Sequence, residues 1–407
     1  MSKQGKFTNI QNRKKKTLFF IVLSVVMAGG YFITDGAFWF LFTVIYLLPN
    51  YYLYRRFRKL FDNQKQRIIF LIIFFLIVAA FPVGEALEHN TNSKIASLSL
   101  WVGYYYLPVL LYMFLLYLLI DLTKVLNRLF EFISASALNT RKFRVVSFAG
   151  ILFVTVIVNI AGIYYFNNTR ITEYNIDIKR QASDVDNLKI ALAADFHFSE
   201  RTYRSFVSQF VEKINSSNPD IVLFPGDLIE SIPGEDKSEF IRQELDKIEA
   251  PYGVYASEGN HELYGNSDKL SFFDKTKIQF LQDTVVVFED VFTLIGRKDK
   301  QDRQRKPLEQ LLEATPGHLP KIVLDHQPYE LEKKSRNDIA LQLSGHTHHG
   351  QLFPFNLITK AIYRISWGHS EINDTHFFVT CGAQGWGPPV KTSSYSEIME
   401  INVEFTD

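Results

Sequence analysis

Long and almost uninterrupted apolar runs dominate the first 166 residues. A run of roughly 18 or more apolar residues can cross a membrane, because about 20 residues at 1.5 Å rise span a hydrocarbon core about 30 Å thick. Five such runs crowd into this stretch, which is more than buried core helices would explain. The pattern therefore predicts an all-α transmembrane domain of about five helices over residues 1–166. The predicted helices are 17–34, 37–54, 68–87, 99–120 and 145–166.

The pattern changes near Asn187. Short apolar runs now alternate with polar residues and glycine, as in "LKIALAADFHF" and "DIVLFPGDLIE". Runs of this length, rich in β-branched and aliphatic residues, are typical of strands. Helical patterns lie between several of them, for example over 204–216 and 240–248. We therefore expect an α/β domain over 187–407, joined to the helices by a linker over 167–186.

Charge is divided as unevenly as hydrophobicity. Residues 1–150 hold 18 Lys and Arg against 6 Asp and Glu, whereas the remainder holds 26 against 37. The overall formal charge of +1 therefore describes neither half, and no nucleic-acid partner is expected. Cys381 is the single cysteine, so no intramolecular disulfide can form, and its strand-like context favours a small buried side chain.

The basic residues near the apolar runs predict the orientation in the membrane. The N-terminal tail and the loops after the second and fourth runs together hold 17 Lys and Arg, whereas the opposite loops hold only Lys94. Basic loops stay in the cytoplasm. We therefore expect a multi-pass protein of the cell (inner) membrane with a cytoplasmic N-terminus. An odd number of crossings then places the domain after residue 166 outside the cytoplasm.

No charged residue lies deep inside any of the five runs. Ion and proton pathways normally need such a residue. The helices are therefore expected to anchor the protein or to contact lipid or a partner, and transport is not favoured.

Polar residues that can bind metals follow five of the predicted strands. Ligands gather beyond the carboxyl ends of strands in such sheets. In an extended chain, residues two apart point to the same side, which would direct both members of "DFH" and of "HTH" at one place. A single strand-end Asp is most often a cap or a turn residue, but five groups in one domain favour a metal site. The mixture of carboxylate, amide and imidazole suits two transition-metal ions rather than a thiolate zinc site. The candidates are Asp195, His197, Asp227, Asn260, His261, His326, His346 and His348.

The segments ADFH, GD, GNHE, DHQP and GHTHHGQ resemble, in order, the five signature blocks of the calcineurin-like metallophosphoesterases. They are most similar to the membrane-anchored bacterial branch whose last block reads GHTHGGQ. "GRKD" and "CGAQGWGPPVKTSSYSEI" also match that branch. The resemblance covers about residues 187–405, leaves out the helices, and implies a β-sandwich flanked by helices.

The resemblance also implies a role for each candidate. One metal would be held by Asp195, His197, Asp227 and His348, and the other by Asp227, Asn260, His326 and His346. The ions would be divalent or trivalent Mn, Fe or Zn, and a hydroxide bridging them would attack the substrate. His261 would stabilise the transition state or protonate the leaving oxygen. Arg297 would contact a phosphate oxygen, although a solvated loop arginine is an alternative.

These roles define the expected function. The protein is predicted to be a membrane-anchored phosphoesterase acting on a phosphomonoester or phosphodiester, with a membrane lipid phosphate among the candidate substrates. The alternative is a non-catalytic membrane sensor or binding protein whose outer domain carries metal. Neither the substrate nor the oligomeric state follows from the sequence.

Four positions depart from the family pattern. Ala194 replaces a Ser, and Glu262 replaces the Asp that commonly follows GNH. Lys391 stands where relatives have an arginine, which removes a bidentate phosphate contact. His349 replaces a glycine, and we expect it to point away from the ions. None of these changes removes a predicted ligand.

Overall fold

The computed structural model describes residues 43–88, 94–179, 185–264, 268–289 and 291–406. The chain divides into two compact units, residues 1–157 and 158–407. The division falls inside the long helix α7, Arg141–Asn167. Each unit is described by itself below.

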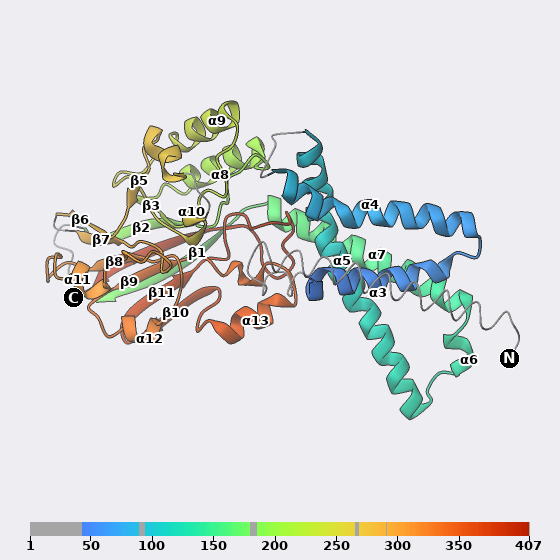
Figure 1. Cartoon of the computed structure of the whole chain (residues 1–407). Coiled ribbons are helices and arrows are strands. Elements are labelled where there is room, and N and C mark those ends of the chain that lie inside the picture. Colours follow the sequence, from blue (N-terminus) through green and yellow to red (C-terminus); the bar gives the residue numbers. More distant parts are fainter. Residues whose placement is uncertain (1–42, 89–93, 180–184, 265–267, 290, 407) are drawn as a thin grey trace, which may run out of the picture. The chain divides into compact units, whose positions relative to one another are not determined.

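Every secondary-structure element described in the first unit is a helix (Figure 1). Within the described residues, three helices are long and apolar enough to cross a membrane: α4 (Gln64–Glu88), α5 (Lys94–Phe130) and α7. They contain the predicted spans 68–87, 99–120 and 145–166. The span 17–34 lies outside the described residues. Residues 43–54 of the second span belong to the π-helix η1 (Thr43–Leu47) and to α3 (Leu48–Phe57), which continues through η2 (Arg58–Leu60). The short helix α6 is Ala135–Leu138.

Helices α4 and α5 approach closely at two glycines. A Cβ on Gly84 would lie 2.7 Å from the backbone nitrogen of Leu100, and one on Gly103 would lie 2.6 Å from the Cα of Phe81. Small residues let apolar helices bring their backbones together, which favours helix association in lipid.

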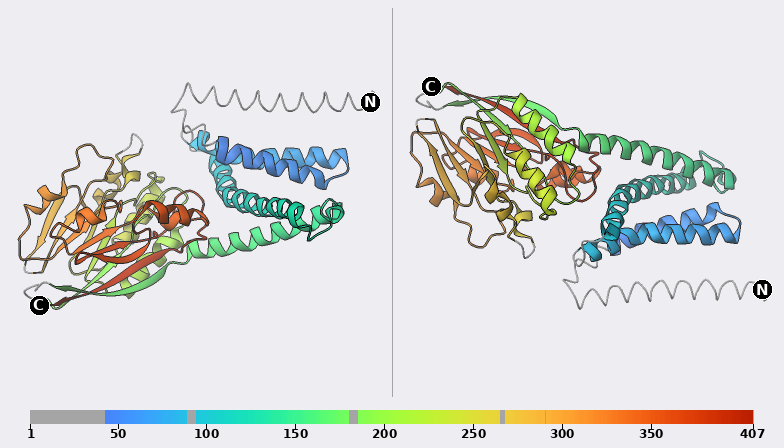
Figure 2. Two further views of the ribbon diagram at one scale, coloured as in Figure 1. Left: turned by 90° about the horizontal axis from the view of Figure 1, so that it is seen from below. Right: turned by 90° about the horizontal axis from the view of Figure 1, so that it is seen from above.

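The second unit is a sandwich of two six-stranded mixed sheets with helices on its outer faces (Figure 2). The first sheet has the order β1-β12-β2-β3-β4-β5, and the second has the order β10-β11-β9-β8-β7-β6. The fold is therefore the β-sandwich flanked by helices that was expected. The strands of the first sheet are β1 (Arg170–Lys179), β2 (Asn187–Leu192), β3 (Ile221–Pro225), β4 (Val254–Ser257), β5 (Gln279–Leu281) and β12 (Glu397–Thr406). Those of the second are β6 (Thr284–Phe288), β7 (Phe292–Gly296), β8 (Lys321–Leu324), β9 (Leu341–Ser344), β10 (Gly368–Ile372) and β11 (Thr375–Val379).

The core lies in layers because the central strands are apolar on both faces. Between the sheets, Leu192 and Leu223 of the first sheet belong to one cluster with Leu343 of the second. A second cluster lies between the first sheet and two helices, α8 (Arg204–Ser216) and α9 (Glu235–Leu245). Burial of such side chains stabilises the fold by about 25 cal/mol per Å² of apolar surface. The remaining short helices of this unit are α10 (Asn260–Leu263), η3 (Leu270–Lys275), α11 (Leu308–Leu312), α12 (Leu331–Lys334), η4 (His348–Gly350) and α13 (Phe355–Ile362).

The predicted linker, 167–186, was wrong in its middle part. Strand β1 occupies Arg170–Lys179 and pairs in parallel with β12 along its whole length. Its buried residues, Ile176 and Ile178, alternate with exposed polar ones. A search for unbroken apolar runs misses this pattern, which is typical of a strand with one buried face.

Candidate metal centre

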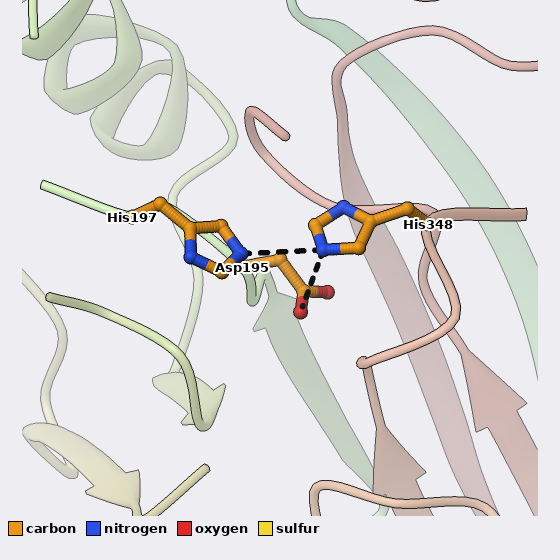
Figure 3. A group of neighbouring side chains, drawn as sticks. All are labelled: Asp195, His197 and His348. Atoms are coloured by element: carbon orange, nitrogen blue, oxygen red, sulfur yellow. Dashed lines mark hydrogen bonds and ion pairs between the residues drawn. The ribbon is translucent and has the colours of Figure 1, made fainter. Parts of the chain in front are cut away.

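The structure places every predicted ligand just beyond the carboxyl end of a strand. Asp195 and His197 follow β2, Asp227 follows β3, and Asn260 follows β4. His326 follows β8 and His346 follows β9 of the other sheet, while His348 begins η4. The site therefore lies where the ends of the two sheets meet. Three groups of side chains among the described residues are spaced closely enough to hold an ion, and two of them consist entirely of predicted ligands. These two are Asp195, His197 and His348 (Figure 3), and Asp227, His326 and His346.

The local conformation differs from the one expected. Asp195 and His197 do not stand in extended chain; their φ angles are +58° and +50°. His346 and His348 likewise have φ of +73° and +46°. Left-handed backbone is uncommon for residues other than glycine and costs free energy. The alternation argument was therefore wrong about geometry, since tight loops rather than a pleat direct these side chains inward.

Spacing within the first group fits metal ligation. His197 Nε2 lies 3.2 Å from His348 Nε2, which lies 3.6 Å from Asp195 Oδ1 (Figure 3). Two ligand atoms that are each about 2.1 Å from one ion, at angles of about 90–120°, stand about 3.0–3.6 Å apart. The Nδ1 of His197 lies 3.0 Å from Glu230 Oε2 and donates to it, which leaves Nε2 with a lone pair for the ion.

The second group has the same features. His326 Nδ1 donates to the Pro225 carbonyl at 2.7 Å, so Nε2 is the ring atom directed at Asp227 Oδ2, at 3.0 Å. Among the described residues, His326 Nε2 and Asn260 Oδ1 are buried atoms without a hydrogen-bond partner. Buried polar atoms are normally paired. An ion at this place would satisfy both atoms, so the residues present fit a second metal.

Charge in the site also favours cations. Burial disfavours the imidazolium of His326, but the nearby negative charge of Asp227 raises the pKa of His326 to about 10. Burial and the positive charge of His326 lower the pKa of His346 to about 3. Burial, with His197 nearby, also lowers the pKa of His348 well below its usual range. The carboxylates therefore attract positive charge, while His346 and His348 are held neutral as metal ligands require.

Two carboxylates, Asp195 and Glu262, connect the loops of the site by hydrogen bonds. The Asp195 carboxylate accepts from the backbone nitrogen of His346 at 3.0 Å, which joins the first sheet to the second. The Glu262 carboxylate accepts from the backbone nitrogens of Gly259, Asp227 and Ile229, at 2.7, 3.0 and 3.0 Å. The glutamate that departs from the family pattern therefore clamps the loops that carry Asp227 and Asn260.

Two further departures, His349 and Lys391, are explained by the surroundings of the side chains. His349 is buried away from both groups, with Nδ1 3.0 Å from Ser366 Oγ. The ammonium group of Lys391 is buried and donates to the carbonyls of Cys381, Gly382 and Tyr395, so it supports the loop beside the ligands. Cys381 is fully buried, as expected from its context.

Arg297, the expected substrate contact, lies in an internal ion-pair network. Its side chain is buried, and its guanidinium donates to Asp325 Oδ2 at 2.9 Å and to the Lys306 carbonyl at 3.1 Å. Arg305 and Lys334 also donate to Asp325 Oδ2, at 2.6 and 2.7 Å. Arg297 is therefore engaged in an internal ion-pair network next to His326.

Sequence reasoning missed Glu230. Its Oε2 lies 3.0 Å from His197 Nδ1 and 2.6 Å from His261 Nδ1, so one carboxylate oxygen orients both rings. Burial opposes ionisation of Glu230, but hydrogen bonds and charge from His197 and His261 hold its pKa below its usual range. One glutamate three residues after Asp227 carries no distinguishing signal in a single sequence.

Comparison with known proteins agrees with this site. Residues 188–350 match the model of the calcineurin-like phosphoesterase family. An uncharacterized metallophosphoesterase of Helicobacter pylori is 33% identical over 223 residues, which cover 53% of this chain and 60% of that protein. A transmembrane protein with a metallophosphoesterase domain from Danio rerio is 28% identical over 298 residues, 68% of each chain. The chain thus spans less than two thirds of the H. pylori relative.

Among solved structures, the sulfate thiohydrolase SoxB of Thermus thermophilus is similar over 53% of this chain and 56% of that chain. Its identity is 10% and its TM-score 0.32, and nothing further is drawn from that distant likeness. Residues 188–350 of the second unit are therefore similar to a calcineurin-like phosphoesterase domain, and among the described residues they are preceded by helices suited to a membrane.

Proposed function

We propose that the protein is a membrane-anchored, two-metal phosphoesterase that hydrolyses a phosphomonoester or phosphodiester. The observation that carries this proposal is the pair of ligand groups, each with carboxylate and imidazole atoms at the spacing that one ion requires. Hydrogen bonds from neighbouring residues hold the ligands in place. Glu230 accepts from His197, the Pro225 carbonyl accepts from His326, and Glu262 accepts from the backbone nitrogen of Asp227.

The first ion would be held by Asp195, His197, His348 and Asp227, and the second by Asp227, Asn260, His326 and His346. Two such ions supply positive charge that lowers the pKa of water and neutralises phosphate oxygens. The chain's part is to hold these side chains in fixed positions, so that little reorganisation is needed during the reaction.

His261 is the group proposed to give a proton to the leaving oxygen. Its backbone nitrogen donates to Asp227 Oδ1 at 2.8 Å, and its ring Nδ1 lies 2.6 Å from Glu230 Oε2, so the backbone and the ring are each held by one carboxylate. Nε2 is then the ring atom that exchanges a proton with the substrate.

Hydrolysis by the purified full chain tests the proposal. Metal-stripped protein, resupplied with Mn²⁺, Zn²⁺ or Fe²⁺, is assayed with p-nitrophenyl phosphate and bis-p-nitrophenyl phosphate, and bound metal is measured by mass spectrometry. We expect metal-dependent hydrolysis that is lost in His326→Ala and kept in His318→Ala, whose imidazole is exposed and remote from the ligand groups. A wild-type chain that binds metal but hydrolyses neither ester would favour the non-catalytic binding role.

The orientation in the membrane is a separate part of the proposal and rests on the basic loops. Fusions of alkaline phosphatase and of a fluorescent protein after Leu60, Thr140 and Asp407 test it. We expect phosphatase activity only from the fusion at Asp407 and fluorescence only from the other two. The reverse pattern at Asp407 would place the catalytic domain in the cytoplasm.

A further inference from the structure

Helix α13 presents its apolar side chains outward. Leu357, Ile358 and Ile362 are 58%, 55% and 60% exposed, and no residue of this helix is buried. Its polar residues Asn356 and Thr359 are instead half-buried toward the domain. A surface helix of a soluble domain normally turns its apolar stripe to the core. The reversed pattern therefore needs an apolar surface outside the domain.

Hydrogen bonds connect the start of this helix to the end of α7. The backbone nitrogen of Phe353 donates to Thr392 Oγ1 at 2.9 Å, and that of Thr392 donates to the Gln351 carbonyl at 2.9 Å. One residue earlier, the backbone nitrogen of Lys391 donates to the Gly162 carbonyl of α7 at 2.9 Å. A Cβ on Gly162 would lie 2.5 Å from Val390 Cγ1, so only glycine allows this close approach.

The position of Gly162 along α7 indicates the depth of this contact. Gly162 precedes the last residue of α7, Asn167, by five positions, which corresponds to about 7.5 Å along the axis at 1.5 Å per residue. It lies within the apolar stretch of a candidate membrane span. Amphipathic helices that lie in the membrane interface bury their apolar faces by about 5–10 Å. The segment joined to Gly162 is therefore at the depth of the interface.

From these observations we infer that Phe353 and the apolar face of α13 dock into the lipid bilayer that α7 enters. The charges on and near α13 support this inference. Lys360 is the only charged residue of the helix, Arg364 follows shortly after it, and both are exposed. Basic side chains beside an apolar face favour membranes that contain anionic lipids.

The docked surface continues to the metal centre. Tyr363, directly after α13, has its ring centroid 6.1 Å from that of His346. On another side, the 58% exposed Trp386 has its ring centroid 6.1 Å from that of His261. The amide of Gln351 donates to the Trp386 carbonyl at 3.1 Å, which ties this tryptophan to the segment before α13. Aromatic residues thus line the way from the apolar face to the ligands.

This arrangement names a substrate class, which rests on the proposed function. A phosphate ester whose apolar part stays in the bilayer can reach the centre along the docked edge without leaving the membrane. The site is therefore suited to amphipathic phosphate esters, with the phosphate at the metal ligands and the acyl chains beside α13.

Site-directed fluorescence tests the docking without any need for activity. Cys381 is fully buried, so a thiol-reactive fluorophore would label a cysteine introduced at Ile358, or at the control position Val287 on β6, which is 41% exposed. The labelled full chain is reconstituted into vesicles of phosphatidylethanolamine and phosphatidylglycerol that contain lipids spin-labelled near the headgroup. We expect strong quenching at position 358 and little at 287. Equally weak quenching, or equally strong quenching, at the two positions would overturn the inference.

A second measurement tests the substrate class. We compare Leu357→Ser/Ile358→Ser with Val287→Ser, using bis-p-nitrophenyl phosphate in solution and phosphatidic acid in vesicles. The double variant should keep its rate on the soluble ester and lose about tenfold or more on the vesicle substrate, because two apolar side chains no longer enter the interface. An unchanged rate on vesicles would refute the substrate class. A wild-type chain inactive on both substrates would refute the proposed function, and quenching would still decide the docking.

Discussion

Glu230 offers the sharpest test of how the centre is organised, because one carboxylate oxygen serves two histidines with different proposed roles. Oε2 lies 3.0 Å from Nδ1 of His197, a proposed metal ligand, and 2.6 Å from Nδ1 of His261, the proposed acid. Hydrogen bonds to charged groups contribute about 1.5–3 kcal/mol each. Replacing a residue that supports a metal ligand typically lowers metal affinity or activity by about 10–100-fold.

We therefore expect Glu230→Gln to lower kcat/KM by about tenfold and Glu230→Ala by about 100-fold, which correspond to about 1.4 and 2.7 kcal/mol. Glutamine keeps the volume and one acceptor oxygen but loses the negative charge, so its effect should be the smaller. The assay is hydrolysis of bis-p-nitrophenyl phosphate by the full chain over a range of Mn²⁺ concentrations. A loss of activity that disappears at saturating metal results from weaker metal binding through His197. A loss of kcat that remains at saturating metal results from the misplaced acid, His261.

Glu200→Gln is the matched control, since Glu200 is exposed and its carboxylate contacts the Gly234 backbone nitrogen at 3.0 Å and the Lys237 ammonium at 3.4 Å rather than a member of either ligand group. It should leave both parameters within about twofold of the wild type. If Glu230→Ala also keeps its metal affinity and kcat within that range, the two imidazoles do not depend on the shared carboxylate, and this account of the site is wrong.

Three further predictions concern neighbouring residues. His348→Ala should abolish hydrolysis and reduce bound metal. His349→Gly should retain activity, because residue 349 has φ of +48° and its ring lies away from both ligand groups. Activity and metal content are measured for both variants, and an inactive His349→Gly beside an active His348→Ala would contradict the prediction. Gly259→Ala should lower activity by at least about tenfold, since the added Cβ would stand 2.2 Å from Asp227 Oδ1 and displace a shared ligand; a fully active variant would contradict this steric argument. Cys381 should resist thiol reagents in the native chain and react after denaturation, because burial raises its thiol pKa; rapid native labelling, followed by mass spectrometry, would show that this loop opens.

Much of the architecture follows from local patterns that the sequence displays directly. Long apolar runs mark helices α4, α5 and α7, because a spanning helix needs length and hydrophobicity more than any particular neighbour. The central strands of the sandwich are buried on both faces and therefore appear as short apolar runs. The ligand candidates follow those runs in chain order, so their convergence at the strand ends could also be expected. Strand β1 was not predicted, because only alternate residues, such as Ile176 and Ile178, are buried and they form no continuous apolar run.

What the sequence by itself determined is which residues are candidate metal ligands and which segments are apolar enough to span a membrane, since both depend on residue type and spacing. Only the tertiary structure decided where those residues point. It assigned left-handed backbone to Asp195 and His348, brought Glu230 between two histidines, and enclosed Arg297 in a network around Asp325. It also turned the apolar face of α13 outward. These features depend on contacts between segments distant in the chain, and a single sequence does not specify such contacts residue by residue.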